Sequence, residues 1–442
     1  MPDIPKSRLA RSAVLGKALL KAGSVHAKDS LRKALRNDTD HQETEERLAK
    51  IVMDALGELK GVSVKIAQQV ALMFPFLPET YLNEMQKSFQ GVAPINRALL
   101  RKRIKQEFGG YPEALFETFD AIPLGSASLG QVHRVRYHGR ELALKVQYPG
   151  IASTLESDLS LVRMGFKRFA KGNDVQAIMQ EISERLHEEV DYLQEADNIE
   201  YFRRRIDRPN IHIPEVVPEL CTRQILATTL LKGQTLNQLL DAYPPQEVRD
   251  HYAQLMFDTL FEMLYRHRSI HADPNPGNFL FLPEGNLGML DFGCIKRFDE
   301  TFLHSFSTLH KALIKGADDA FLTQCYVQLG MVDPDTPQKM LMFYTEVIKP
   351  LDRIYIEIFQ DDHYRFSSER SFTKRGFATV MEVYRKQFDS VHKFNADFLF
   401  LDRTILGYYA IFEQMDATIS TTSVKSLIAR HDREELSWRV WS

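Results

Sequence analysis

Four polar residues have types and spacings that suit phosphoryl transfer from a nucleotide. Lys145 lies inside the apolar run 143–146, where an ammonium group is costly unless it meets an anion such as a phosphate. Asp273 precedes Asn278 by five residues, the D-x-x-x-x-N spacing of a kinase catalytic loop, and Asp291 begins an Asp-Phe-Gly triplet eighteen residues after Asp273. Because phosphoryl transfer depends mainly on charges placed around the nucleotide, this set predicts a site for ATP and Mg²⁺.

Each signal also has an ordinary structural explanation when it is taken alone. A strand lysine can extend its ammonium group to the edge of a sheet, and a Pro/Gly-rich loop with Asp and Asn is usually a turn. An Asp-Phe-Gly triplet can simply end a hairpin. Their order along the chain favours chemistry, with Asp273 orienting or deprotonating the acceptor and with Asn278 and Asp291 as the magnesium ligands.

The elements that must position these residues begin with helices. Apolar residues at three- and four-residue spacing predict a long helix over 42–74, and 79–108 predicts a second helix that closes at Gly109. Residues 153–206 return to helical periodicity after a β-rich segment. From 246 onward most of the chain is predicted to be helical.

Short β-rich runs separate these helical segments. Residues 131–137 and 141–147 are two such β-rich runs, and His138-Gly139 between them predicts a tight hairpin turn. A β-branched run follows at 222–230, and 279–291 resembles a second short hairpin.

The fold class expected from this layout is α+β, in the form of a two-lobed protein-kinase-like fold. A chain of 442 residues is too long for a single core, which stops growing at about 250–300 residues. The expected parts are a basic N-terminal arm, a helical extension, an N-lobe with inserted helices and a mostly helical C-lobe, at 1–40, 41–118, 119–232 and 233–442.

The cysteine content and the lack of long apolar runs indicate the cellular compartment of the protein. The three cysteines, Cys221, Cys294 and Cys325, form no C-x-x-C pair, so neither a disulfide framework nor a zinc site is indicated. A reducing compartment follows: the cytoplasm, with a peripheral position at the inner membrane as an option, or the mitochondrial matrix for a eukaryotic source. The sequence contains no uncharged apolar run of about 18 residues, so we expect no membrane-spanning helix.

The net charge of −3 is unevenly distributed. Residues 1–36 hold nine Lys and Arg residues against two Asp residues. Lys17, Lys21, Lys28 and Arg32 share one helical face, which suits an anionic membrane surface. An ordinary solvated helix, a frayed terminus and a mitochondrial transit peptide are alternative interpretations.

Several motifs together resemble the UbiB (AarF) family of atypical kinases, which is associated with ubiquinone biosynthesis. The likeness covers roughly 45–430 in one collinear order. The motifs are Lys65-Ile66-Ala67-Gln68, the segment 125–133 with Gln131-Val132-His133, Lys145-Val146-Gln147-Tyr148-Pro149-Gly150, Glu189-Val190-Asp191-Tyr192 and the segment 271–278.

The resemblance assigns further roles. It implies that Lys145 contacts the nucleotide phosphates and pairs with Glu195 on a helix equivalent to kinase αC, and that Glu189 and Asp191 form an ExD motif. Lys65 and Gln68, three apart on one helical face, would cover the active site and meet the ExD carboxylates. On one continuous helix Glu189 and Glu195 would point about 120° apart, which favours separate partners for the two carboxylates.

Two departures from the family pattern stand out. Ala67 replaces a glycine of the family, and its methyl group could loosen the docking of the covering helix. The predicted nucleotide-binding loop is Gly125-Ser126-Ala127-Ser128, where the family usually has Ala-Ala-Ala-Ser. A glycine at its start would allow positive φ and close approach to phosphate.

No Ala-Pro-Glu segment follows Gly293, which argues against docking of peptide substrates. The expected activity is therefore that of an atypical kinase or ATPase that supports ubiquinone or isoprenoid-lipid metabolism, with the phosphate acceptor left open. Expected partners are ATP, isoprenoid lipids or quinone precursors, an anionic membrane surface and enzymes of ubiquinone biosynthesis, and not nucleic acid. A nucleotide-binding pseudokinase scaffold and a small-molecule phosphotransferase are the alternatives.

Overall fold

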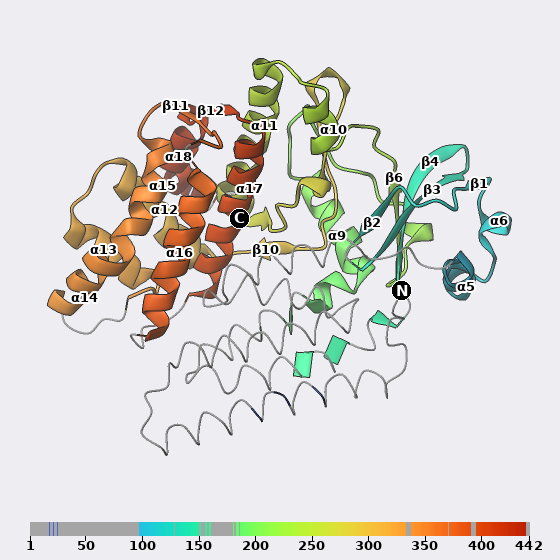
Figure 1. Cartoon of the computed structure of the whole chain (residues 1–442), viewed down its shortest axis with the longest axis horizontal. Coiled ribbons are helices and arrows are strands. Elements are labelled where there is room, and N and C mark those ends of the chain that lie inside the picture. The colour runs from blue at the N-terminus through green and yellow to red at the C-terminus, as the bar shows by residue number, and fades with distance from the viewer. Residues whose placement is uncertain are drawn as a thin grey trace. The chain divides into compact units, whose positions relative to one another are not determined.

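The computed structural model describes two compact units, which Figure 1 shows in one view. The first contains the described residues up to Gln194 together with Val217–Thr229, and the second contains Glu195–Val216 and the residues from Leu230 onward. The described residues are Lys17, Lys21, Ser24 and 97–438, except 128, 149, 152–154, 157–158, 161–179, 181–182, 185, 333–336, 370 and 390–394. The predicted helix over 42–74, with Lys65 and Gln68, lies outside them, as does Ser128.

The first unit is built on an antiparallel sheet. Strand β3 (Gly130–Tyr137) pairs with β4 (Arg140–Gln147), and β4 pairs with β6 (Ile225–Thr229). The short strands β1 (Thr118–Phe119) and β2 (Gly125–Ala127) both pair with β3. The predicted hairpin is confirmed, and His138 and Gly139 at its turn both have positive φ, 47° and 74°, as a two-residue type I′ turn requires.

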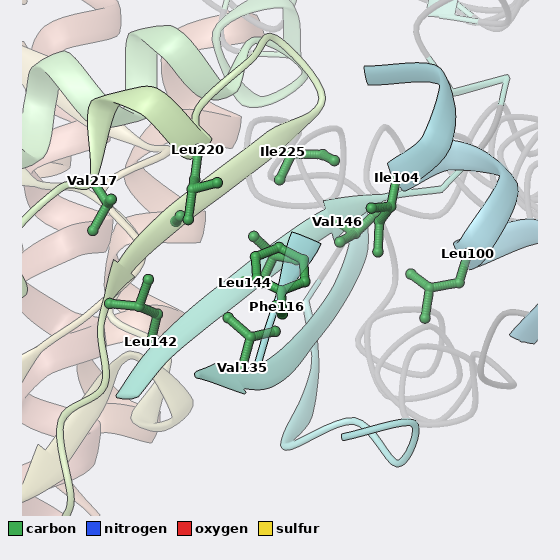
Figure 2. Close-up of a cluster of buried hydrophobic side chains, with 11 residues drawn as sticks. Leu100, Ile104, Phe116, Val135, Leu142, Leu144, Val146, Val217, Leu220 and Ile225 are labelled. Carbon is green, nitrogen blue, oxygen red and sulfur yellow. The ribbon is translucent and has the colours of Figure 1, made fainter. Parts of the chain in front are cut away.

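One face of this sheet carries the core of the unit. Leu142, Leu144 and Val146 alternate along β4 and are almost fully buried. Figure 2 shows them grouped with Leu100 and Ile104, which come from helix α5 (Arg97–Phe108). Because successive side chains of a strand point to opposite faces, Lys145 lies on the face of β4 away from this core.

Along the chain, helices come before and after the strands of this sheet. Helix α5 ends where Gly109 takes a φ of 78°, in agreement with the prediction that this segment closes at Gly109. The short helix α6 (Pro112–Leu115) follows, and α9 (Tyr192–Arg203) comes after the hairpin. The 3-10 turn η1 (Pro218–Leu220) precedes β6.

The second unit combines short strands with a large helical part. Strand β5 (Ile211–His212) runs parallel to β9 (Leu287–Met289), which pairs with β8 (Phe279–Phe281) in the predicted second hairpin, and β7 (Ser269–His271) pairs with β10 (Ile295–Arg297). The helices are α10 (Leu236–Asp241), α11 (Gln246–His267), α12 (Glu300–Ile314), α13 (Asp319–Gln328), α14 (Pro337–Phe343), the π-helix η4 (Tyr344–Ile348), α15 (Lys349–Phe359), α16 (Phe372–Asp389), α17 (Ala396–Gln414) and α18 (Thr422–Trp438).

Helix α11 organises this helical part. It contacts α17 and α18, while α16 packs on α17 and α12 on α15, and Figure 1 shows these helices side by side. Phe257, Leu260 and Phe261 of α11 are fully buried among aromatic rings of the neighbouring helices. A further strand pair, β11 (His363–Arg365) with β12 (Thr418–Ser420), is one that the sequence did not predict.

The core of the first unit provides a direct test of these packing relations. Replacing the buried Leu144 with alanine should lower the stability of the sheet by about 2–5 kcal/mol, because a large buried side chain leaves a cavity. Hydrogen exchange at the β4 amides measures this. The control is Leu99→Ala on α5, where the side chain is 41% exposed and the change should stay within about 0.5 kcal/mol. Equal effects of the two substitutions would contradict the packing described here.

Candidate active site

The loop after β7 is closed by hydrogen bonds of its own. The Asn278 side-chain amide Nδ2 donates to the Asp273 carbonyl oxygen at 3.0 Å, and the Asn275 side chain accepts from the Gly277 backbone N–H at 2.9 Å. The 3-10 turn η2 (Pro276–Asn278) ends the loop. Because Nδ2 of Asn278 is engaged, the Oδ1 acceptor is the side-chain group that remains for a cation.

The Asp-Phe-Gly segment is tied directly to this loop. The Leu290 backbone N–H donates to the Asn278 carbonyl oxygen at 2.8 Å. Nε2 of the fully buried His271 lies 3.0 Å from the carbonyl oxygens of both Leu290 and Asp291, so this nitrogen carries the proton and donates to them. Asp291 has a φ of 52°, which is uncommon for a non-glycine residue. These contacts hold the uncommon conformation of Asp291 and tie the preceding residue, Leu290, to the Asn278 backbone.

Helix α9 fixes the other side of the Asp-Phe-Gly segment. The buried Asn198 donates from Nδ2 to the Phe292 carbonyl oxygen at 2.9 Å, and its Oδ1 accepts from Arg297 at 2.8 Å. A Cβ atom on Gly293 would lie 3.6 Å from Glu195 Oε2 and 3.1 Å from Asp291 Oδ1. Sequence reasoning missed Asn198, although a polar residue one helical turn after Glu195 was a usable signal.

The residues of this loop fit a magnesium ion that is bound together with a nucleotide. Asn278 and Asp291 offer amide and carboxylate oxygens, the ligands that Mg²⁺ prefers. In the part of the chain that the structure describes, no group of three or more His, Cys, Asp or Glu side chains is arranged to hold a metal ion. The predicted pair would therefore hold Mg²⁺ with help from phosphate oxygens and water, which is the usual mode for this ion.

The first unit presents the predicted phosphate-binding lysine. Lys145 is half-buried, and its Nζ lies 5.0 Å from the centre of the Tyr192 ring, a cation–π distance. Tyr192 is almost fully buried, and its hydroxyl oxygen would be 2.7 Å from a Cβ atom on Gly130. Tyr192 therefore supports both the lysine and the strand that follows the predicted nucleotide-binding loop. The predicted Lys145–Glu195 pair joins residues of different units and stays a prediction.

The start of the predicted nucleotide-binding loop is extended backbone. Gly125 and Ser126 are part of strand β2 with Ala127, and Gly125 is absent from the positive-φ residues. A Cβ atom at Gly125 would have nothing within 4 Å among the described residues. Gly125 therefore does not use the positive φ that a glycine allows, because pairing with β3 imposes an extended conformation.

The segment with Glu189 and Asp191 also corrects the sequence interpretation. The expectation of one helix through Glu189 and Glu195 is wrong, since the helix ends at Glu189 and α9 begins at Tyr192. Gln147 Nε2 donates to the Val190 carbonyl oxygen at 2.8 Å, which holds the chain outside the helix.

Asp191 has a local role in this break. Its side chain accepts from the Leu193 backbone N–H at 3.1 Å, as a residue that caps a helix N-terminus does. Arg223 lies 3.6 Å from the same carboxylate, in an exposed pair of small energetic value. The predicted contacts of Glu189 and Asp191 with Lys65 and Gln68 stay predictions, because the latter two residues lie outside the described part of the chain.

The Gln131-Val132-His133 motif supports the sheet. Both polar side chains are buried, with His133 Nδ1 2.8 Å from the Asp120 carbonyl oxygen and Nε2 3.4 Å from Gln131 Oε1. Burial lowers the pKa of His133, although the Asp120 carbonyl opposes this change. A neutral imidazole stacked on Phe119 at 5.2 Å therefore connects β3 to the chain after β1.

The two glycines near the predicted nucleotide-binding loop provide a matched pair of substitutions. Gly130→Ala should lower the melting temperature, because its Cβ atom would lie 2.4 Å from the Val146 carbonyl oxygen and against Tyr192. Overpacking of this kind costs about 1–3 kcal/mol. Gly125→Ala, with open space around the added methyl group, should leave the melting temperature unchanged. Thermal unfolding of the two variants measures both melting temperatures. A Gly130→Ala protein with the melting temperature of the wild type would refute the close approach of Gly130 to Val146.

The chain is similar to known proteins in sequence and in fold. Residues 87–324 match the ABC1 atypical kinase-like domain. The chain is 29% identical over 298 residues to the protein Activity of bc1 complex kinase 8, chloroplastic, of Arabidopsis thaliana, covering 65% of this chain and 39% of that protein. It is 29% identical over 277 residues to atypical kinase coq-8, mitochondrial, of Caenorhabditis elegans, covering 60% of this chain and 36% of the worm protein.

This chain therefore spans well under two thirds of the length of these two relatives. Among solved structures, Rv3197 of Mycobacterium tuberculosis in complex with erythromycin is similar, with a TM-score of 0.60 and 25% identity over 90% of this chain and 97% of that one. The matched domain covers more than half of the chain and contains Lys145, Glu195, Asp273, Asn278 and Asp291. The kinase-like α+β fold and the resemblance to UbiB are confirmed, and the chain belongs to the ABC1 atypical kinase-like family.

Proposed function

We propose that this chain binds ATP with Mg²⁺ and transfers or hydrolyses the terminal phosphate, in support of ubiquinone or other isoprenoid-lipid metabolism. The observation that carries the proposal is the closed arrangement of Asp273, Asn278 and Asp291. A bound Mg²⁺ would neutralise charge that develops on the phosphates. Asn278 Oδ1 and the Asp291 carboxylate would hold it, and Lys145 would contact the phosphates.

Asp273 would act on the acceptor. Its backbone is fixed by the Asn278 side chain, and the residue is half-buried within the loop. In the proposed step the acceptor O–H gives its proton to Asp273 as its oxygen bonds to the terminal phosphorus. The bond from that phosphorus to the ADP oxygen breaks, and ADP leaves. The acceptor would be water or a hydroxyl of a small or lipid-like molecule.

The chain after Asp-Phe-Gly supports a non-protein acceptor. Strand β10 starts at Ile295, two residues after Gly293, and α12 starts at Glu300. This leaves little chain for a long activation loop that could dock a peptide. A pseudokinase scaffold is the alternative, and it needs nucleotide binding without turnover.

The proposed location is a membrane surface that the basic N-terminal arm recognises. Among the described residues, no helix combines the length and apolar composition needed to cross a bilayer. Each Lys or Arg near an anionic surface contributes about 1 kcal/mol, and salt screens the attraction. The support for this location is the excess of basic residues in 1–36.

The first test addresses magnesium and ATP together. Asp291→Asn should abolish the Mg²⁺-dependent thermal stabilisation by ATP, which is about 2.7 kcal/mol at a hundredfold excess of ligand over the Kd. The control is Asp241→Asn, an exposed carboxylate at the end of α10 that should keep the full stabilisation. If Asp291→Asn kept the Mg²⁺-dependent stabilisation by ATP, the assignment of Asp291 as a magnesium ligand would be wrong.

The second test addresses turnover and acceptor. Steady-state ATP hydrolysis should rise when liposomes of anionic lipid with phenolic lipid precursors are added, and Asp273→Asn should lose activity while it still binds ATP. A chain that begins at residue 40 should keep its basal hydrolysis and lose the stimulation by liposomes. Equal hydrolysis by the wild type and Asp273→Asn would favour the scaffold.

A further inference from the structure

Helix α17 lies beyond the segment 87–324 that matches the family domain, yet it touches the candidate catalytic loop. A Cβ atom at Gly407 would lie 2.2 Å from Pro274 Cγ and 2.9 Å from Pro274 Cβ. These distances are too short for any side chain, so the helix backbone itself packs on the residue after Asp273. Glycine is required at this contact for steric reasons.

The start of α17 is fastened to the chain that follows Asp-Phe-Gly. Asp397 in its first turn lies 2.5 Å from Nζ of Lys296, a nearly buried residue of β10. The ammonium group also lies 5.4 Å from the centre of the Phe400 ring. The helix is therefore held at two places, beside β10 and against the loop, and Tyr408 directly follows the second contact.

Tyr408 follows the contact glycine and has an unusual environment. It is 1% exposed, and its ring meets that of Phe279, the residue after Asn278, with 5.6 Å between ring centres. Its hydroxyl oxygen is buried and has no hydrogen-bond partner among the described residues. Burial, together with the charge of the Asp273 carboxylate, raises the pKa of Tyr408, so the phenol stays a hydrogen-bond donor at neutral pH. A buried donor without a partner is unfavourable for folding, and phenylalanine would avoid that cost.

We propose that Tyr408 is a positioning residue for Asp273: in the nucleotide-loaded site its O–H donates to one oxygen of the Asp273 carboxylate. The other carboxylate oxygen is then directed at the acceptor. This inference rests on the proposed function, and it adds a residue from the helical part after the matched domain to the site. It also gives a role to a hydroxyl at a buried position where the described residues supply no acceptor.

A purely structural role for Tyr408 predicts a different effect of removing its hydroxyl group. If the ring only fills space against Phe279, then removal of the hydroxyl should leave catalysis unchanged and should stabilise the fold. The neighbouring Tyr409 provides the comparison. It is also buried on α17, but its ring packs on Phe366 and Phe412 rather than on the loop.

The experiment compares Tyr408→Phe with Tyr409→Phe in the full chain, using Mg²⁺ and ATP. For Tyr408→Phe we expect a melting temperature at or above that of the wild type and an unchanged KM for ATP. We expect its kcat to fall about tenfold to a hundredfold, the range for one hydrogen bond to a charged group. Tyr409→Phe should keep the wild-type kcat. A wild-type kcat in Tyr408→Phe, or a kcat loss accompanied by a large drop in melting temperature, would overturn the inference and leave the proposed function intact.

A second measurement covers a chain that binds ATP without turnover. The melting temperatures of Tyr408→Phe, Asp273→Asn and the double variant are then compared with and without Mg²⁺ and ATP. Non-additive effects that occur only with nucleotide support the contact, and additive effects refute it. If the wild type binds no nucleotide at all, the proposed function fails and this inference fails with it.

Discussion

The backbone and side chain of Asn278 are the constraint on which the candidate site depends. The side-chain amide holds the Asp273 carbonyl oxygen, and the Asn278 carbonyl oxygen accepts from Leu290. One residue thus joins the candidate catalytic loop to the Asp-Phe-Gly segment. His271 adds two hydrogen bonds, to the carbonyl oxygens of Leu290 and Asp291, and Asp291 has a positive φ. A non-glycine residue with positive φ persists where surrounding contacts determine it, and the contacts of His271 and Asn278 do so beside Asp291.

The first unit uses a different constraint, which is the two-residue periodicity of strand β4. Leu144 and Val146 face the core, so Lys145 between them faces the other side of the sheet. There the Tyr192 ring lies under the ammonium group and against Gly130. A lysine that is half-buried on a strand therefore has an aromatic ring as support for its charged group. The same periodicity places the buried Gln131 and His133 on one face of β3.

Much of the fold and of the candidate site follows from local patterns. The two β-rich runs within 131–147 and the His138-Gly139 turn predict the hairpin, because strand propensity and turn geometry are properties of a few neighbouring residues. The spacing from Asp273 to Asn278 predicts their proximity because five residues form one compact loop. The break between Glu189 and Tyr192 was missed, since it depends on Gln147, 43 residues earlier in the chain.

The sequence by itself determined the family, the loop residues and the strand lysine, because the chemistry of phosphoryl transfer restricts residue type and local spacing. Only the tertiary structure decided how Asn198 reaches Phe292, that Gly125 is extended, and that Gly407 meets Pro274. These contacts join residues far apart in sequence or depend on strand pairing. Neither the periodicity nor the composition of the sequence predicts which buried surfaces contact one another when the helices and strands pack.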